Sequence, residues 1–368
     1  MYLEHLSLFD FKNYAEARFD FKSKINCLLG NNGVGKTNLL DAIHYLSFTK
    51  SALGNTDAQS VKHGKGQFML KGHFNINNAV TQVTCAYLPG SKKTIQVDGH
   101  QPGRLSDHIG KYPVVMVAPN DIELVWGGSE WRRKFFDSMI AQIDRQYLED
   151  LISYNYNLRQ RNGLLRLSGQ GTLDRDLLEA YDQKLVATGS RIYQRRESFL
   201  REFLPLFAAH YQYLSGDKGE ESNIVYRSDG EGQDFAAMLK NSLRKDLVLQ
   251  RTSVGVHRDD FLFQLAGYEL KREGSQGQQK SFLIGLKLAE FQSIELHKAV
   301  KPLLLLDDIF DKLDDERIDK LVARVAEGSF GQIFITDARP HRSEGLLRNA
   351  LLEVELFHIG QGNPITVE

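Results

Sequence analysis

An eight-residue stretch near the N-terminus, Gly30 to Thr37, constrains this chain more than any other part of its sequence. It reads GNNGVGKT and matches the phosphate-binding pattern G-x-x-x-x-G-K-[ST]. The preceding residues 25–29 predict a short buried strand, and apolar residues at helical spacing after Thr37 predict a helix. A strand that runs through glycines into a helix is the context that this pattern requires. We therefore expect a nucleotide-binding α/β lobe.

The residue types in this phosphate loop (residues 30–37) indicate how it would hold a nucleotide. Its glycines let the backbone N–H groups curl around an anion, and the positive end of the next helix adds to the same site. Lys36 is expected to reach the β- and γ-phosphates, and the Thr37 hydroxyl to ligate Mg²⁺. An ordinary glycine-rich turn is the alternative, which the context disfavours. The candidate nucleotide-binding residues are Gly30, Asn31, Asn32, Gly33, Val34, Gly35, Lys36, Thr37 and Asn38.

Composition narrows the remaining classes of protein. Of the 368 residues, 42% are hydrophobic and 25% are charged, as in ordinary globular proteins. Lys and Arg number 46 against 47 Asp and Glu, so any basic surface for nucleic acid must be local. The two cysteines, Cys27 and Cys85, disfavour a disulfide framework or a cysteine metal site. Neither a signal peptide nor a stretch of roughly 18 apolar residues is evident, so we expect a cytoplasmic protein without a membrane.

The residue pattern changes twice along the chain. Residues 1–125 carry strand signals, including antiparallel strands between residues 67 and 99. Residues 126–250 are mostly helical in pattern. Within them, residues 132–202 carry 13 Lys and Arg against 10 Asp and Glu, a mild basic excess that is compatible with DNA contact. Strand signals return in residues 251–368. We therefore predict an α/β head in two parts, a mixed sheet with helices plus an antiparallel β element, and an inserted α-helical arm domain.

A second cluster of chemistry-bearing residues lies far downstream of the phosphate loop. Four leucines, residues 303–306, predict a strand buried on both faces, and Asp307 and Asp308 follow it. Ligands bind at this end of the strands in open α/β sheets. We expect Asp307 beside Mg²⁺, and Asp308 as the catalytic carboxylate that orients or deprotonates the attacking water. An acidic helix start is the alternative, and the phosphate loop makes it the weaker one.

A further helix start offers another site for anions. It carries Ser275, Gln276, Gly277 and Gln278. One triphosphate does not need two such ends, so we expect this one to act in trans, over the γ-phosphate held by a second copy of the chain. A similar string at residues 167–170 lies too far upstream of Asp307, and we discard it. The residues alone thus support an ATPase with ATP and Mg²⁺ as cofactors that closes as a homodimer.

In this order, the motifs resemble those of the ABC-type ATPases of chromosome maintenance, the SMC class. An insertion of ~150–200 residues is too short for their long coiled coils, since a helix rises only ~1.5 Å per residue. The chain resembles most closely the RecF family of bacterial DNA replication and repair proteins, over essentially its whole length. The resemblance rests on residues 30–38 and on further strings at residues 119–121, 132–137, 154–162, 257–260 and 275–280.

The resemblance implies an ABC-type ATPase head and a weak, DNA-dependent ATPase. Such a protein would bind single- and double-stranded DNA at gaps without regard to sequence, dimerise on ATP, help RecR/RecO-type mediators load a recombinase, and reset by slow hydrolysis. It also implies switch and D-loop residues Asp311, Asp314, Thr336 and Asp337. The candidate DNA-binding residues are Lys92 and Lys93 at a hairpin tip, for which a solvated turn is the alternative, and Arg132 and Arg133 in the arm.

The chain departs from the family's usual pattern at several positions. Lys12 stands for an arginine, and Asp41 and Asn120 each stand for a glutamate. Residues 50–53 read KSAL where relatives commonly show KSFR, which puts the contact of that arginine in doubt. Transporter ATPases place a histidine at the switch, so Thr336 or Asp337 would have to sense the γ-phosphate here.

Two other functions stay open at this point. The first is the soluble ATPase subunit of a membrane transporter, which the helical arm, the Gln-rich helix start and the missing switch histidine disfavour. The second is a nucleotide-gated scaffold with negligible turnover, which needs the same phosphate site as a slow ATPase.

Overall fold

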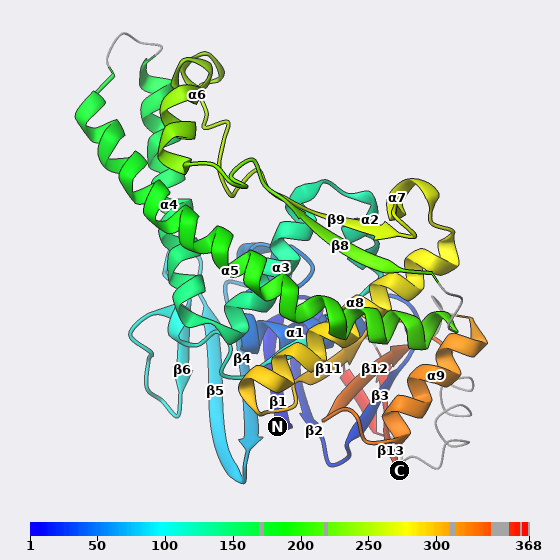
Figure 1. Ribbon diagram of the computed structural model, residues 1–368. Coiled ribbons are helices and arrows are strands. Elements are labelled where there is room, and N and C mark those ends of the chain that lie inside the picture. Colours follow the sequence, from blue (N-terminus) through cyan, green and yellow to red (C-terminus); the bar gives the residue numbers. More distant parts are fainter. Residues whose placement is uncertain (169–172, 217–219, 310–313, 340–352, 361–362, 367–368) are drawn as a thin grey trace. The chain divides into compact units, whose positions relative to one another are not determined.

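The computed structural model describes residues 1–168, 173–216, 220–309, 314–339, 353–360 and 363–366 (Figure 1), the last range by its backbone alone. Contacts divide the chain into two units, which we describe separately. Unit 1 comprises Met1–Ile122, His210–Lys218 and Gln276–Glu368, and unit 2 comprises Glu123–Ala209 and Gly219–Ser275. Within the described ranges, no helix is both long enough and apolar enough to cross a membrane.

The main sheet of unit 1 places the phosphate loop and the four-leucine strand close together. Its strand order is β14-β13-β3-β12-β11-β7. Every residue of β3, β7, β11 and β12 is buried, as expected for parallel strands that are covered on both faces. The strands are β3 (Ile25–Leu29), β7 (Val114–Val117), β11 (Leu303–Leu306), β12 (Ile333–Asp337), β13 (Val354–Gly360) and the antiparallel edge strand β14 (Asn363–Thr366). The helices of this unit include α1 (Lys36–Phe48), α8 (Gln276–Lys298) and α9 (Asp315–Ala326).

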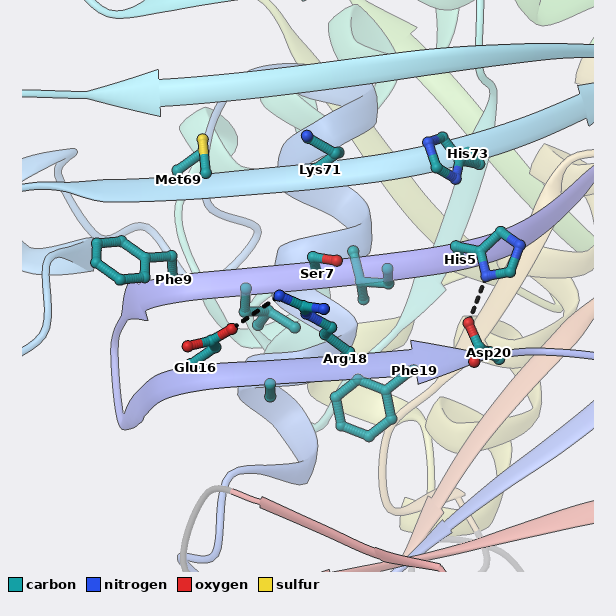
Figure 2. A pocket seen from close by; sticks show the side chains of 13 residues that line it. His5, Ser7, Phe9, Glu16, Arg18, Phe19, Asp20, Met69, Lys71 and His73 are labelled. Carbon is teal, nitrogen blue, oxygen red and sulfur yellow. Dashed lines mark hydrogen bonds and ion pairs between the residues drawn. The ribbon is translucent and has the colours of Figure 1, made fainter.

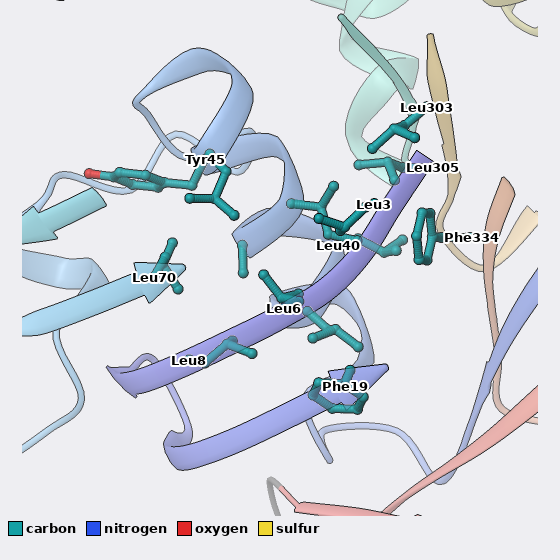
Figure 3. Packing of buried hydrophobic residues seen from close by; sticks show 14 of the residues in the cluster. Leu3, Leu6, Leu8, Phe19, Leu40, Tyr45, Leu70, Leu303, Leu305 and Phe334 are labelled. Atoms are coloured by element: carbon teal, nitrogen blue, oxygen red, sulfur yellow. The ribbon is translucent and has the colours of Figure 1, made fainter. Parts of the chain in front are cut away.

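A second sheet of unit 1 is antiparallel, with strand order β2-β1-β4-β5-β6. Its inner face and α1 form the hydrophobic core, where leucines of β1 meet Leu40 and Tyr45 of α1, and Leu305 and Phe334 of the main sheet (Figure 3). The alternation of apolar and polar residues along β1 produces this one-sided burial. The strands are β1 (Tyr2–Phe11), β2 (Tyr14–Asp20), β4 (Phe68–Ile76), β5 (Ala79–Tyr87) and β6 (Thr94–Val97).

The outer face of this sheet carries a shallow pocket of about 540 Å³ (Figure 2). Its side chains mix both charges with apolar groups: Arg18 pairs with Glu16, His5 contacts Asp20, and Phe9 is partly exposed beside them. Because cations and carboxylates nearly balance on this face, it shows no preference for one sign of ligand.

Unit 2 contains the helical arm and a small sheet. The arm consists mainly of α4 (Arg145–Ser168) and α5 (Arg175–Ser215), the long green helix in Figure 1, whose last residues belong to unit 1. The small antiparallel sheet has the order β10-β9-β8. The remaining elements of this unit are α2 (Glu123–Trp126), α3 (Ser129–Ile143), β8 (Ser222–Arg227), α6 (Phe235–Leu249), β9 (Asp260–Leu265), β10 (Tyr268–Glu269) and α7 (Leu270–Glu273).

Two fully buried arginines hold unit 2 together. Arg196 of α5 donates hydrogen bonds to Asp137 of α3 and to Asp259, at 2.8 and 3.1 Å. Arg161 of α4 likewise binds Asp246 at 2.7 Å. A buried guanidinium needs such paired carboxylates, because removing one partner leaves an uncompensated charge. Several strings that carry the family resemblance therefore meet here as a structural ion-pair network.

The two units differ from the expected domains at more than one border. Residues 251–275 were expected in the head, but they belong to unit 2. The reason is that β9 pairs with β8 over six residue pairs, a long-range contact that the sequence pattern does not reveal. Unit 1 also takes His210–Lys218 at the end of α5.

Candidate nucleotide-binding site

The phosphate loop between β3 and α1 has the backbone that its glycines predict. Gly30, Gly33 and Gly35 have φ angles of 154°, 83° and 115°, in the region that disfavours other residues. At Gly35, a Cβ atom would also lie 2.2 Å from the side-chain nitrogen of Asn13. No side chain larger than hydrogen fits there, so the curl of the loop depends on this glycine.

The turn between β1 and β2 supports the phosphate loop from outside. The Asn13 amide donates a hydrogen bond to the Val34 carbonyl at 2.8 Å, and the Tyr14 hydroxyl donates one to the Gly35 carbonyl at 3.0 Å. Asn13 also accepts a hydrogen bond from Asn38 at 2.7 Å. The sequence did not reveal this supporting role, although the Lys-Asn-Tyr string at residues 12–14 was the available signal.

Lys36 lies at the first position of α1, with its ammonium group directed over the loop. Its Nζ donates to the carbonyl oxygens of Gly30 at 2.8 Å and Asn31 at 3.1 Å, and the residue is only 5% exposed. Carbonyl oxygens are weak partners for a largely buried cation. A phosphate oxygen in the loop would therefore be a stronger ligand for the ammonium group than its present partners.

Asp307 meets the phosphate loop through the register of the parallel strands. The Thr37 hydroxyl donates to the two Asp307 carboxylate oxygens at 2.9 and 3.0 Å, across 270 residues of sequence. Thr336, at the end of β12, donates to Asp307 Oδ1 at 2.8 Å. Burial raises the pKa of Asp307 above its ordinary value; hydrogen bonds from Thr336 and Thr37 oppose this rise, and the nearby Asp308 adds to it.

These residues fit a magnesium ion. A hydroxyl and a buried carboxylate are the hard oxygen donors that Mg²⁺ prefers, and here they lie within hydrogen-bond distance of each other. Among the described residues, no group of three or more His, Cys, Asp or Glu side chains is suited to hold a metal. Two protein ligands plus nucleotide phosphates is the usual arrangement for Mg²⁺ in such sites.

Thr336, one of the two residues expected to sense the γ-phosphate, contacts both aspartates. Its hydroxyl binds Asp307 and also accepts a hydrogen bond from the Asp308 N–H at 2.9 Å. Asp308 has a φ of 47°, a strained left-handed backbone for a residue other than glycine. Thr336 therefore holds the pair of aspartates in place. Asp337, the other switch candidate, is buried beside the loop, where its carbonyl accepts the Gly30 N–H at 3.3 Å.

The glutamine-rich helix start lies at the first turn of α8, with Ser275 exposed just before it and Gln276, Gly277 and Gln278 in the turn. Asp314 caps α9 by accepting the Arg317 N–H at 3.1 Å. The Arg317 guanidinium then donates to Ser281 of α8 at 2.6 Å. Asp314 and the start of α8 are thus linked within unit 1, while Asp311 lies outside the described residues.

Three of the four candidate DNA-binding side chains are engaged in structural contacts. Lys93 pairs with Asp57 at 2.9 Å and is 12% exposed. Arg132 makes two hydrogen bonds to Asp260, at 2.8 and 2.9 Å. Arg133 is partly buried and donates to the Asp259 carbonyl and the Ser129 hydroxyl at 2.6 Å. These contacts argue against the DNA role expected of Lys93, Arg132 and Arg133, whereas Lys92 is exposed.

Two of the positions that depart from the family's pattern compensate one another. Lys12 pairs with the fully buried Asp41 at 2.5 Å. The Asp41 carboxylate also accepts the Ser51 hydroxyl at 2.8 Å and the Ala52 N–H at 2.6 Å. The segment at residues 50–53 therefore satisfies the buried charge with its backbone and a serine.

A buried ionic triad lies on α8 beside the loop after β7. Lys287 pairs with Asp121 at 3.1 Å and with Glu290 at 3.7 Å. Burial raises the pKa of Glu290 to about 7, although the attraction of Lys287 acts in the opposite direction. The string at residues 119–121 thus provides a structural contact between this loop and α8.

Known proteins resemble this chain over nearly its full length. A family model described as the RecF/RecN/SMC N terminal domain matches residues 2–356. The DNA replication and repair protein RecF of Flavobacterium johnsoniae is 42% identical over 360 residues, which cover 98% of this chain and 100% of the relative. RecF of Cytophaga hutchinsonii is 43% identical over 363 residues, which cover 98% of this chain and 96% of the relative.

Comparison with solved structures leads to the same family. The recombination mediator protein RecF with ATP, from the RecFOR pathway, has a TM-score of 0.89 at 30% identity and covers 100% of this chain and 98% of its own. The Smc head domain of Pyrococcus yayanosii has a TM-score of 0.58 at 14% identity and covers 100% of this chain and 97% of its own. At that identity the second comparison shows a shared fold alone.

Proposed function

Because the chain belongs to the RecF family of DNA replication and repair proteins, within the ABC-type ATPases, we propose that it is an ATP-switched DNA-binding protein of recombinational repair. ATP binding would close two copies of the chain on DNA, and slow hydrolysis would release them. The protein would act at DNA gaps together with mediators of the RecR/RecO type, which help load a recombinase there. The relative named as a recombination mediator in the RecFOR pathway supports this assignment.

The observation that carries the proposal is the contact between the two motifs. Thr37 of the phosphate loop and Thr336 of β12 both donate to Asp307, and the Asp308 N–H donates to Thr336. Lys36 would bind the γ-phosphate, Thr37 and Asp307 would hold Mg²⁺, and Asp308 would orient the attacking water. Bound Mg²⁺ supplies neutralisation of the charge on the transferred phosphoryl group.

The transporter subunit is the weaker alternative for this site. Transporter ATPases place a histidine at the switch, whereas this chain has Thr336 at the expected position, and the Thr336 hydroxyl binds Asp307. The non-hydrolysing scaffold differs from a slow ATPase only in turnover, so phosphate release with and without DNA separates those two functions.

The residues of the helix start, Ser275 to Gln278, are proposed to act in trans. They would complete the site formed by Lys36 and Thr37 of a second copy. Ser275→Arg should then leave ATP binding by the monomer nearly intact and block both dimerisation and hydrolysis.

Mixing two inactive proteins tests this arrangement. A mixed dimer of Ser275→Arg and Lys36→Met chains keeps one complete composite site, so partial ATPase activity should return on mixing, provided that one site suffices for closure. Each protein alone at the same total concentration is the control. Full activity of Ser275→Arg protein as a monomer would show that the helix start does not act in trans.

DNA binding is proposed to be independent of sequence and sensitive to salt, since the overall charge of −1 leaves only local basic surface for phosphates. Lys92 remains a candidate contact, and Arg159 and Arg166 of α4 are exposed arginines whose side chains have no partner among the described residues. Replacing each with glutamine should reduce the salt slope of log K by roughly 0.7–0.9 per lost phosphate contact. Affinity that stays constant from 50 to 200 mM salt would contradict a surface that binds the DNA backbone.

A further inference from the structure

Unit 2 contains a pocket of about 280 Å³ that involves none of the nucleotide-binding residues. One wall is a face of α5, and the opposite wall is the segment 228–235 between β8 and α6. Gly255 and Val256 also line it. The volume is at the small end of ligand pockets, which suits one side chain or one base rather than a cofactor.

Close packing around Phe235 fixes the base of this pocket. A Cβ atom at Gly189 would lie 2.4 Å from the Phe235 ring, and one at Gly255 would lie 2.7 Å from it. Gly255 also has a φ of +117°, which side-chain-bearing residues rarely adopt. The Phe235 ring therefore packs directly against the glycine backbone at both positions.

The walls present polar groups that have no intramolecular partner. Among the described residues, the side chains of Ser190, Gln194 and Gln233 make no hydrogen bond. Ser190 and Gln194 share one face of α5 with Tyr193, because residues three and four apart lie on the same side of a helix. A hydroxyl, two amides and an aromatic ring therefore surround the same small space.

The charge around Tyr193 is negative. Glu197, one turn further along the same face of α5, and Glu231, in the opposite wall, are both exposed and form no ion pair within the described chain. After burial, these two carboxylates are the main causes that raise the pKa of the Tyr193 hydroxyl. The pocket therefore lies in a field that attracts cations and repels phosphates.

The arginines on neighbouring turns of α5 do not cancel this field. Arg191 is bound to Asp150 at 2.5 Å, and Arg195 is bound to Asp144 at 2.8 Å. Arg227 is on β8, where alternation places it on the strand face opposite Tyr226, whose ring lies 5.6 Å from that of Tyr193.

We propose that this pocket binds an arginine or lysine side chain presented by a basic segment of a partner protein. The cation would lie against the Tyr193 ring, an attraction that aromatic faces provide. The oxygens of Ser190, Gln194 and Gln233 would accept its N–H groups, and Glu197 and Glu231 would balance its charge. A nucleobase would match the volume of the pocket. The phosphates of its nucleotide, however, would face the carboxylates of Glu197 and Glu231.

Fluorescence anisotropy with labelled eight-residue peptides tests the proposal. The probe peptide alternates glycine and arginine, and the comparison peptides alternate glycine with glutamine or with glutamate. We expect binding of the arginine peptide only, weakened about three- to tenfold in a Glu197→Gln/Glu231→Gln double variant, since exposed ion pairs contribute modestly. Glu179→Gln is the matched control: it removes an exposed carboxylate from the same helix, ~27 Å along its axis from Glu197, and should leave the affinity unchanged.

The aromatic ring is tested separately. Tyr193→Phe should keep the affinity for the arginine peptide, and Tyr193→Ala should lose most of it. A photoactivatable arginine peptide should crosslink to residues 189–194 and 228–235. Equal affinities for the native and double-variant proteins, or crosslinks confined to other segments, would overturn the proposal. Binding of an oligothymidylate that depends on Tyr193 and is unaffected by the glutamine changes would instead assign the pocket to a nucleobase.

Discussion

Thr336→Val removes one hydroxyl that joins Asp307 and Asp308, with little change in side-chain volume. The hydroxyl donates to Asp307 at 2.8 Å and accepts the Asp308 N–H at 2.9 Å, and the residue is fully buried. A hydrogen bond to a charged group contributes about 1.5–3 kcal/mol. A buried N–H group left without a partner costs about 1–3 kcal/mol more.

This loss of interaction energy slows the reaction only to the extent that it raises the free energy of the transition state relative to the ATP-bound ground state. If that rise equals the energy of the carboxylate hydrogen bond alone, kcat for ATP hydrolysis falls about 10- to 150-fold. ATP binding should persist, because Lys36 and the phosphate loop are unchanged. Thr336→Ser, which keeps the hydroxyl, is the matched control and should retain most of the activity.

The pH dependence gives a second readout of the same substitution. Asp307 must be ionised to hold Mg²⁺, so activity falls as the pH drops through the pKa of this carboxylate. The Thr336 hydrogen bond lowers that pKa. Its removal should therefore move the acid limb of the kcat profile to higher pH. Native kcat in Thr336→Val protein, or a loss that is entirely a loss of ATP affinity, would refute the assigned role of Thr336.

Four further outcomes follow from the structure. Asp308→Asn should bind ATP and stall before hydrolysis, so phosphate release at the parental rate would exclude Asp308 as the water-orienting carboxylate. Glu290→Gln should change how thermal stability depends on pH: the raised pKa of Glu290 gives the native chain stability that is present below about pH 4.5 and lost as the pH rises through about 7. Melting temperatures of both proteins at pH 5 and pH 8 check this, and a constant difference between them would contradict it. Arg132→Ala should cost about 3 kcal/mol in chemical denaturation because it leaves the Asp260 carboxylate without its partner. Lys92→Ala, by contrast, should leave stability unchanged and weaken DNA binding.

Sequence-based prediction is most accurate for sites whose functional residues lie close together in the chain. The phosphate loop and the four-leucine strand carry their own glycines, lysine and aspartates, and the parallel sheet then brings Thr37 and Asp307 together. What the sequence lacks is the identity of distant partners. Arg132 is an exposed cation in the sequence pattern, but its partner Asp260 lies 128 residues away. The role of Thr336 is equally long-range, because a hydroxyl on one strand acts on the carboxylate of the next.

The border of the head was mispredicted for the same reason. Strand signals after residue 250 are correct, but the pairing of β9 with β8 places them in unit 2. Periodicity shows which residues form a strand and does not show which strand lies beside it. The turn at Asn13 and Tyr14 is a related case, since nothing local in its sequence identifies the phosphate loop that it supports.

The proposed ATP-dependent closure is tested most directly by the mass of the protein in solution. Light scattering on a sizing column would be run on Asp308→Asn protein, in which hydrolysis cannot reset the state, with ATP and Mg²⁺, with ADP and Mg²⁺, and without nucleotide. We predict twice the mass of one chain with ATP and the mass of one chain in the other two conditions. The mass of one chain at saturating ATP and micromolar protein, with and without DNA, would contradict the account.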